Sequence, residues 1–434
     1  MTLNDWLSHL ESLHPRGQAG IELGLERVRA VKARLGQAQR CPVITVGGTN
    51  GKGSTCAYLE SILGKAGFRV GCYSSPHLLA YNERVRINGA PVGDAALCAA
   101  FAKVEAARLA SGAALTYFEF GTLAAWEVFA AAGIEAAVLE VGLGGRLDAV
   151  NIYEPDVAIV TTVALDHTDW LGADREAIGF EKAGIFRAGK PALCADPAPP
   201  QSLLAHAAAI GADLRLLGRD FGFTRPAPDA GENRLQWRWW RRSGEQVRRR
   251  SLAWPGLRGP VQLANASVAL AALEAIADKL PVTMQAIRQG LIETELAGRF
   301  QVLPGKPAIV LDVGHNPQAI RTLADNLDGM GFFERTQAVV GMLADKDIAG
   351  ALAALRGRVD VWHAATLGGP RGAAAEKLAA IIAAGKLGGE IVCHPSATGA
   401  MQTAQRQAGE SDRIVAFGSF YTVAEALVAL HRKT

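Results

Sequence analysis

The sequence predicts an α/β protein built from two parallel-sheet domains, the first larger than the second. Uncharged runs rich in β-branched residues alternate with helical stretches, the pattern of a parallel sheet covered by helices on its faces. A glycine-rich loop follows the first apolar run and opens directly into a helix. The alternation pauses over residues 291–299 and then starts again. We therefore place the domains at residues 1–290 and 291–434.

Composition narrows the class of protein. The 434 residues carry a net charge of +3, which argues against a general nucleic-acid binder. The six cysteines are scattered without a C-x-x-C pair, as is typical of the reducing cytosol. No run approaches the roughly 20 uncharged apolar residues of a membrane helix, and the first residues lack a signal-peptide pattern. We expect a cytoplasmic protein that needs no membrane and acts as a monomer.

The elements follow in order along the chain. In the first domain the periodicity predicts strands over 42–46, 68–73, 136–141 and 156–163. It predicts helices over 3–13, 20–35, 94–108, 116–132 and 262–277, with a further helix from residue 54 to a stop at 67. Short alternating segments over 214–254 predict a small β-rich insertion with a hairpin at residues 243–244. In the second domain we expect strands over 308–313, 337–341, 359–363, 390–393 and 413–417.

The loop after the first strand predicts a nucleoside triphosphate site. Its glycines let backbone N–H groups turn toward phosphate, Lys52 adds a positive charge, and the helix N-terminus favours anions. The match to the usual phosphate-loop pattern is imperfect, because Gly53 separates Lys52 from the hydroxyl of Ser54. The domain is thus predicted to be a P-loop ATPase domain. Its expected ATP-binding loop residues are Thr49, Asn50, Gly51, Lys52, Gly53 and Ser54.

Polar residues stand at the ends of several predicted strands. Lys52, Ser75, Glu140 and His167 all follow apolar runs, and the carboxyl ends of parallel strands share one edge of the sheet. A triphosphate needs magnesium, which prefers oxygen ligands. Ser54, Ser75 and Glu140 can supply them, whereas His167 alone is as well explained by a structural histidine.

Two other features have ordinary explanations. Aromatic and basic side chains are interleaved at Trp237, Trp239, Trp240 and residues 248–250, as in some nucleic-acid sites. However, a half-exposed hairpin with alternating inward and outward side chains produces the same sequence pattern. The glycine cluster at 142–145 is not a dinucleotide fingerprint, because its third glycine would fall on Leu147.

Six motifs identify a family resemblance. They are TNGKGS, SPH, EVGLGGRLD, DH, EKAGI and DVGHNP, at residues 49–54, 75–77, 140–148, 166–167, 181–185 and 312–317. Together, and in this order, they resemble the folylpolyglutamate synthase family, relatives of the peptidoglycan Mur ligases, and most closely its bifunctional bacterial members. The glycine after Lys52 separates this family from the Mur ligases, whose loop has a hydroxyl there. Val313 stands where alanine is common.

The resemblance implies two magnesium sites and further nucleotide contacts. Ser75 and Glu140 match a first metal site, and His167 matches a second one. Lys182, which from the sequence alone would be an exposed helix lysine, matches a lysine carried as its carbamate. In the second, Rossmann-like domain, Arg299 matches an arginine that contacts the phosphates, Asp312 an aspartate that contacts the nucleotide, and His315 a histidine that closes the site. In the first domain, Asn265 matches an asparagine that contacts the adenine.

The resemblance also implies an acid-substrate pocket. Thr116 with Glu119 reads locally as a capping box, which would suffice to explain both residues. In the family, this segment and the one around Asp148 face the pterin of dihydropteroate. The implied substrate-binding residues are Thr116, Tyr117, Phe118, Glu119, Leu147, Asp148 and Ala149.

The expected activity is ATP-dependent amide formation. The carboxylate of dihydropteroate or of a reduced folate would attack ATP, giving an acyl phosphate that the amine of L-glutamate then displaces, with catalysis resting on Lys52, Glu140, His167, Lys182, Arg299 and His315. Three alternatives stay open: a Mur-type amino-acid ligase, a P-loop nucleotide phosphohydrolase or switch, and a non-catalytic nucleotide-binding module.

Overall fold

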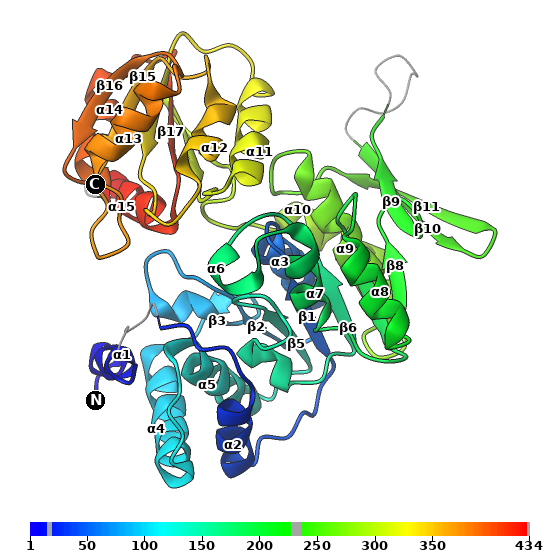
Figure 1. Cartoon of the computed structure of the whole chain (residues 1–434). Coiled ribbons are helices and arrows are strands. Elements are labelled where there is room, and N and C mark those ends of the chain that lie inside the picture. Colours follow the sequence, from blue (N-terminus) through cyan, green and yellow to red (C-terminus); the bar gives the residue numbers. More distant parts are fainter. Residues whose placement is uncertain (15–19, 227–235, 432–434) are drawn as a thin grey trace. The chain divides into compact units, whose positions relative to one another are not determined.

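The computed structural model describes residues 1–14, 20–226 and 236–431. Its contacts group the chain into two compact units (Figure 1). Unit 1 comprises Met1–Gly256 and Gln262–Thr294, and unit 2 comprises Leu257–Val261 and Glu295–Thr434. The functional boundary expected after residue 290 stays a prediction. No helix in the described ranges is both long and apolar enough to cross a bilayer.

Unit 1 is built on an eight-stranded sheet in the order β4-β3-β2-β5-β1-β6-β7-β8. The run from β2 to β8 is parallel, and β3 and β4 add an antiparallel edge. The strands are β1 (Val43–Gly47), β2 (Val70–Tyr73), β3 (Val85–Ile87), β4 (Ala90–Pro91), β5 (Ala136–Glu140), β6 (Val157–Val160), β7 (Pro191–Cys194) and β8 (Asp213–Leu216).

Helices cover both faces of this sheet. The helices are α1 (Leu3–Ser12), α2 (Glu26–Leu35), α3 (Lys52–Lys65), α4 (Asp94–Ser111), α5 (Tyr117–Ala132), α6 (Thr168–Leu171), α7 (Arg175–Ala183), α8 (Gln201–Ala209), α9 (Val261–Ala275) and α10 (Met284–Glu293), with 3-10 turns η2 (Tyr81–Arg84) and η3 (Ala149–Ile152). One core joins the inner sides of α1, α2, α4, α5, α7 and α8 to one sheet face. On the other side α3 lies against β1, β2 and β5, and α10 packs on α3. The central strands are buried along their whole length, as expected of a doubly covered parallel sheet.

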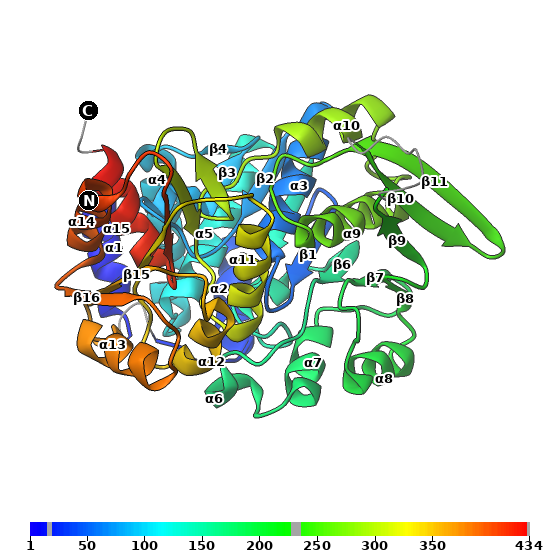
Figure 2. The same ribbon diagram turned by 90° about the horizontal axis from the view of Figure 1, so that it is seen from above.

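The predicted β-rich insertion is confirmed as a three-stranded antiparallel sheet of β9 (Phe221–Thr224), β10 (Gln236–Ser243) and β11 (Gln246–Ala253). In Figures 1 and 2 the β10–β11 hairpin extends away from the main sheet of unit 1. Part of the expected alternating segment, residues 227–235, lies outside the described residues. Trp237 and Trp239 are fully buried, and the Trp239 indole donates to the carbonyl of Ser267 on α9 at 3.2 Å. These two indoles therefore form the core of the insertion, which supports the explanation by strand alternation.

Unit 2 holds a six-stranded sheet in the order β12-β13-β17-β14-β15-β16, parallel except for β12. Its elements are β12 (Gln301–Leu303), β13 (Ala308–Asp312), α11 (Pro317–Asp328), β14 (Thr336–Val340), α12 (Ile348–Leu352), η4 (Ala353–Leu355), β15 (Val361–Ala365), α13 (Ala375–Ala384), β16 (Glu390–His394), α14 (Ala397–Gln407), β17 (Arg413–Phe417) and α15 (Phe420–His431). The five predicted strands are present, and β12 is an addition that the sequence pattern did not indicate. The α/β class with two parallel-sheet domains is confirmed.

Several predicted bounds differ from the structure, and three of the differences have a clear physical reason. Residues 20–25 are not helical, so α2 begins at Glu26; two glycines in that stretch weaken a helix. The strand expected over 156–163 ends at Val160, because the next residues turn to hold the phosphate loop. The expected linker over 291–299 begins later, since α10 continues to Glu293.

Candidate active site

The phosphate loop contains two glycines at which any side chain would displace the loop or its neighbours. Gly48 has φ +135°, and a Cβ there would lie 1.9 Å from Oγ1 of Thr161. Gly51 has φ +93°, and its Cβ would lie 2.5 Å from Oδ1 of Asn265. The positive φ values are unfavourable for residues with a side chain, and both clashes are severe. The loop is therefore packed tightly from two sides.

The residues after β6 fix the loop by hydrogen bonds. Oγ1 of Thr161 donates to the carbonyl of Asn50 at 2.7 Å, and Oγ1 of Thr162 donates to the same oxygen at 3.1 Å. The backbone N–H of Thr49 donates to the carbonyl of Thr162 at 2.7 Å. These bonds orient the loop before any ligand arrives. Sequence reasoning missed Thr161 and Thr162, although adjacent threonines at a strand end next to a glycine loop are a usable signal.

Two lysines meet at one carbonyl of the loop. Nζ of Lys52 donates to the carbonyl of Gly48 at 3.1 Å, and Nζ of Lys182, on α7, donates to the same oxygen at 3.0 Å. Lys182 is 4 % exposed, so its reading as an exposed helix lysine is wrong. Burial, followed by the charge of Lys52, lowers the pKa of Lys182 to about 7. Such an amine is neutral for much of the time near neutral pH, the form that carbamylation needs.

Carboxylates lie at the same end of the sheet. Glu140 is the last residue of β5, is buried, and its Oε2 accepts the backbone N–H of Ser75 at 3.2 Å. Asp148 is also buried; burial raises its pKa to about 7, although the N–H groups of Leu143 and Val150 donate to it at 2.8 and 3.0 Å. Because Lys52 acts electrostatically on Asp148, and Asp148 on Lys182, these groups form one charged cluster.

His167 begins the short helix α6 with φ +52°. Its Nε2 lies 4.0 Å from Oδ1 of Asp166, and Asp166 also acts electrostatically on Lys182. In the described part of the chain, no three His, Cys, Asp or Glu side chains are grouped closely enough to hold a metal ion alone. Magnesium commonly takes only one or two protein carboxylates and completes its shell with water and phosphate oxygens. The hydroxyl of Ser75 and the carboxylate of Glu140 are donors of that kind.

Helix α9 supplies two buried amides to the loop. Nδ2 of Asn265 donates to Oε1 of Gln262 at 3.0 Å, and Nε2 of Gln262 donates to Oγ of Ser54 at 3.4 Å. All three residues are buried. The structure thus brings the predicted Asn265 to the phosphate loop. Gln262 was missed, although it lies three residues before Asn265 and so shares its helix face.

The two segments expected to face the acid substrate lie together. Thr116 and Glu119 form the predicted capping box, with backbone-to-side-chain bonds of 2.8 and 3.3 Å. Glu119 is also paired with Arg27 at 2.9 Å, a partner that the sequence did not indicate. The ring of Phe118 packs so closely on Gly142 that a Cβ there would lie 2.6 Å from it. Residues 116–119 and the loop leading to Asp148 therefore share one surface of unit 1.

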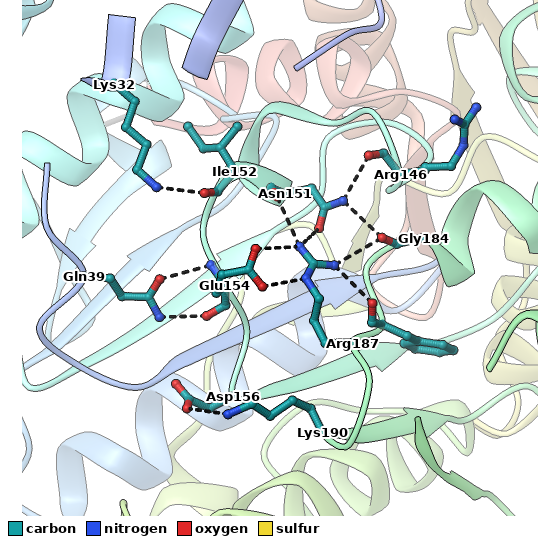
Figure 3. A network of polar contacts seen from close by, with 11 residues as sticks. Lys32, Gln39, Arg146, Asn151, Ile152, Glu154, Asp156, Gly184, Arg187 and Lys190 are labelled. Carbon is teal, nitrogen blue, oxygen red and sulfur yellow. Dashed lines mark hydrogen bonds and ion pairs between the residues drawn. The ribbon is translucent and has the colours of Figure 1, made fainter. Parts of the chain in front are cut away.

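A polar network, drawn in Figure 3, lies beside the stretch that follows Asp148. The guanidinium of Arg187 donates to Oε2 of Glu154 at 2.7 Å and to Oδ1 of Asn151 at 2.9 Å. Nδ2 of Asn151 donates to the carbonyls of Arg146 and Gly184 at 3.0 and 3.1 Å. We call these five residues the arginine network. It joins the stretch after Asp148 to the end of α7.

Unit 2 gathers its own predicted residues at the carboxyl end of β13. Oδ1 and Oδ2 of Asp312 accept the N–H groups of Gly314 and Phe300 at 2.7 and 2.9 Å, while burial raises the pKa of Asp312. Nδ1 of His315 lies 2.9 Å from the carbonyl of Val313. The guanidinium of Arg299 lies 5.0 Å from the ring centre of Phe420 and acts electrostatically on Asp312. These groups form a second cluster, described here for unit 2 alone.

Residues 46–195 match the Mur ligase middle domain family, and residues 298–420 match the Mur ligase glutamate ligase domain family. The chain is 46% identical over 426 residues to the dihydrofolate synthase/folylpolyglutamate synthase of Escherichia coli strain K12, covering 98% of this chain and 94% of the relative. Among solved structures, E. coli FolC in complex with DHPP and ADP is 44% identical with a TM-score of 0.91, covering 100% of this chain and 98% of that one. A bifunctional folylpolyglutamate synthase/dihydrofolate synthase with Mn, AMPPNP and L-glutamate bound is 46% identical with a TM-score of 0.88, covering 99% and 98%.

Proposed function

This chain belongs to the dihydrofolate synthase/folylpolyglutamate synthase family, which makes it an ATP-dependent ligase built from Mur ligase domains, and we propose that it joins dihydropteroate, and reduced folates, to L-glutamate. The observation that carries the proposal is the charged cluster at the phosphate loop. Lys52, Lys182 and Asp148 interact there, at the sheet edge where Glu140 ends β5.

The proposed reaction has two steps. The substrate carboxylate attacks the γ-phosphate of ATP, forming an acyl phosphate and releasing ADP. The amine of L-glutamate then attacks the acyl carbon and expels phosphate. Lys52 and the N–H groups of residues 49–54 hold the phosphates in line, because phosphoryl transfer depends on alignment and charge neutralisation. The surface around Phe118 and Asp148 orients the acid.

A divalent metal, when bound, neutralises the charge that develops on the phosphates. We propose two metal sites: Ser54, Ser75 and Glu140 are donors of the first, and His167 belongs to a second one near Glu140, with Lys182 contributing as a carbamate. The low pKa of Lys182 supports that role, since carbon dioxide adds only to a neutral amine. Asn265 is proposed to contact the nucleotide beside the phosphate loop.

We further propose that Arg299, Asp312 and His315 contact the nucleotide during turnover. The family resemblance supports these roles, and so does their position at the carboxyl end of a parallel strand. A monomeric, cytoplasmic enzyme that uses no nucleic acid is part of the same proposal. The free thiol state of the six cysteines fits a reducing compartment.

The test is the dependence of ADP release on both other substrates. Purified protein is given ATP and magnesium with dihydropteroate or tetrahydrofolate, with and without L-glutamate, and products are identified by mass spectrometry. We expect stoichiometric ADP and a product heavier by one glutamyl residue only when acid and amino acid are both present. Lys52→Ala should lower the rate by orders of magnitude through lost transition-state stabilisation. Steady ADP release without either co-substrate would instead indicate a phosphohydrolase.

A further inference from the structure

Arg84 is a buried cation without a buried anion. It ends the 3-10 turn η2, directly before β3, and is 7 % exposed. Within the described ranges no carboxylate lies in ion-pair distance of its guanidinium. Its hydrogen bond runs from Nε to Nδ1 of His77 at 2.8 Å. Neither Nη nitrogen makes a hydrogen bond in the same part of the chain, and neither is among its fully buried unpaired atoms, so both stay accessible to a ligand.

The neighbouring Arg86, in contrast, is a largely buried arginine whose charge is paired with a carboxylate. It lies two residues further on, and its Nη2 is paired with Oε2 of Glu60 at 2.8 Å. The nearest carboxylate in sequence to Arg84 is Glu83, but its oxygens accept three backbone N–H groups of residues 78–80 at 2.7 to 2.8 Å. Glu83 therefore shapes the turn and leaves Arg84 uncompensated.

Aromatic rings offset only part of the burial. The guanidinium carbon of Arg84 lies 5.5 Å from the ring centre of Tyr81 and 5.6 Å from that of Tyr117. Both distances are near the outer limit of about 6 Å for cation–π attraction. A buried arginine is ordinarily paired with an anion, because its removal from water is unfavourable otherwise. The missing anion is thus most simply supplied by a ligand.

The position of Arg84 indicates which ligand this is. The loop that carries it begins at Ser75, whose N–H donates to Glu140. Its partner ring Tyr117 belongs to the segment proposed to hold the acid substrate. Tyr73 lies in electrostatic range of both Arg84 and Asp148, and its ring centre is 5.7 Å from that of Phe118. Arg84 is therefore next to the surface assigned to the acid.

We propose that Arg84 binds a carboxylate of the acid substrate through its two Nη nitrogens. The proposal rests on the proposed function and adds a substrate-binding residue to it. A planar guanidinium matches a carboxylate with two parallel hydrogen bonds. The bond to His77 fixes the rotation of the guanidinium, and in the neutral tautomer it leaves the Nε2–H of His77 as a further donor. The carboxylate is either the one that reacts or, in a folate, the α-carboxylate of a glutamate already attached.

Direct binding tests the proposal on the full chain. Pteroate and its carboxamide, which lacks the negative charge, are titrated by calorimetry into the wild type, Arg84→Gln, Arg84→Lys and the control Arg34→Gln. Arg34 is an exposed arginine on α2, so its loss removes the same charge elsewhere. We expect Arg84→Gln to weaken pteroate binding by about tenfold or more, the effect of losing a charged hydrogen-bond pair. Carboxamide binding should stay unchanged, and Arg84→Lys should fall between.

Equal weakening of acid and carboxamide binding would overturn the proposal, and so would unchanged pteroate binding together with an unchanged KM for tetrahydrofolate. Should Arg84→Gln not fold, Arg84→Lys and His77→Asn carry the same comparison. Kinetics identifies the carboxylate: a raised KM for both dihydropteroate and tetrahydrofolate indicates the reacting group, and a raised KM for tetrahydrofolate alone indicates the α-carboxylate. Nucleotide binding by Arg84→Gln should match the wild type. A wild type that binds pteroate through Arg84 yet forms no amide would refute the ligase proposal only.

Discussion

Replacing Gly48 by alanine should disable the site while leaving the fold intact. The added Cβ would lie 1.9 Å from Oγ1 of Thr161, whereas ordinary contacts begin at 3.4 Å, so the loop must move by about 1.5 Å (3.4 − 1.9). Thr161 cannot easily rotate away, since its hydroxyl donates to the carbonyl of Asn50 at 2.7 Å and also lies 3.2 Å from the carbonyl of Gly47. The positive φ of Gly48 adds about 1–3 kcal/mol of backbone strain.

The displacement directly affects the two lysines that we propose act in catalysis. The carbonyl of Gly48 accepts hydrogen bonds from both Lys52 and Lys182. When this carbonyl moves, both amines lose the acceptor that positions them. A misplacement of about 1 Å can lower a rate by about 100-fold. We therefore expect kcat/KM for ATP-dependent ligation to fall by about two orders of magnitude.

The matched control is Gly64→Ala. Gly64 lies inside α3, the helix that the phosphate loop opens, and a Cβ there meets nothing within 4 Å. This change should keep full activity and stabilise the protein by up to about 1 kcal/mol through helix propensity. Both variants are compared by circular dichroism, thermal unfolding and the coupled assay for ADP. A folded Gly48→Ala protein with activity within about threefold of the wild type would refute the reasoning, because the loop would then not depend on this contact.

Two further predictions concern other parts of the chain. Asn265→Ala should weaken binding of a non-hydrolysable ATP analogue by about tenfold, because it removes the amide packed on Gly51 and leaves Oε1 of Gln262 without its donor; unchanged affinity by calorimetry would contradict this. In unit 2, burial and then the charge of His394 lower the pKa of His363 to about 4. As the pH falls from 6.5 to 4, His363 is protonated in the unfolded chain but stays neutral in the folded one. The free energy of unfolding of unit 2 should therefore decrease over that range by at most about 3 kcal/mol. Urea unfolding of the wild type and His363→Gln at several pH values measures it, and an equal pH dependence in both proteins would exclude His363 as the cause.

The phosphate loop and the strand ends could be predicted because their signals are local. A β-branched run, positive-φ glycines and a helix start lie within about a dozen residues around Lys52 and need no tertiary information. Glu140 and Ser75 followed from one topological rule, that parallel strands end on a common edge.

Burial of single polar residues could not be predicted in the same way. Lys182 read as exposed because lysine is rarely buried. Its spacing of four from the buried Ile178 was the available signal, and it places Lys182 on the inner side of α7. Arg84 gave no local signal at all, since its missing anion is visible only when the neighbours are known. The short strands β3, β4 and β12 were missed because two or three residues show no periodicity.

The arginine network has a mechanical consequence. Arg187 holds the stretch that follows Asp148 and, through the carbonyl of Gly184, the end of α7, the helix that carries Lys182. The stretch after Asp148 and the end of α7 are therefore rigidly connected, so a displacement of one also displaces the other. Substitution of Arg187 would therefore change the positions of Asp148 and Lys182 together, even though the Arg187 side chain contacts neither residue.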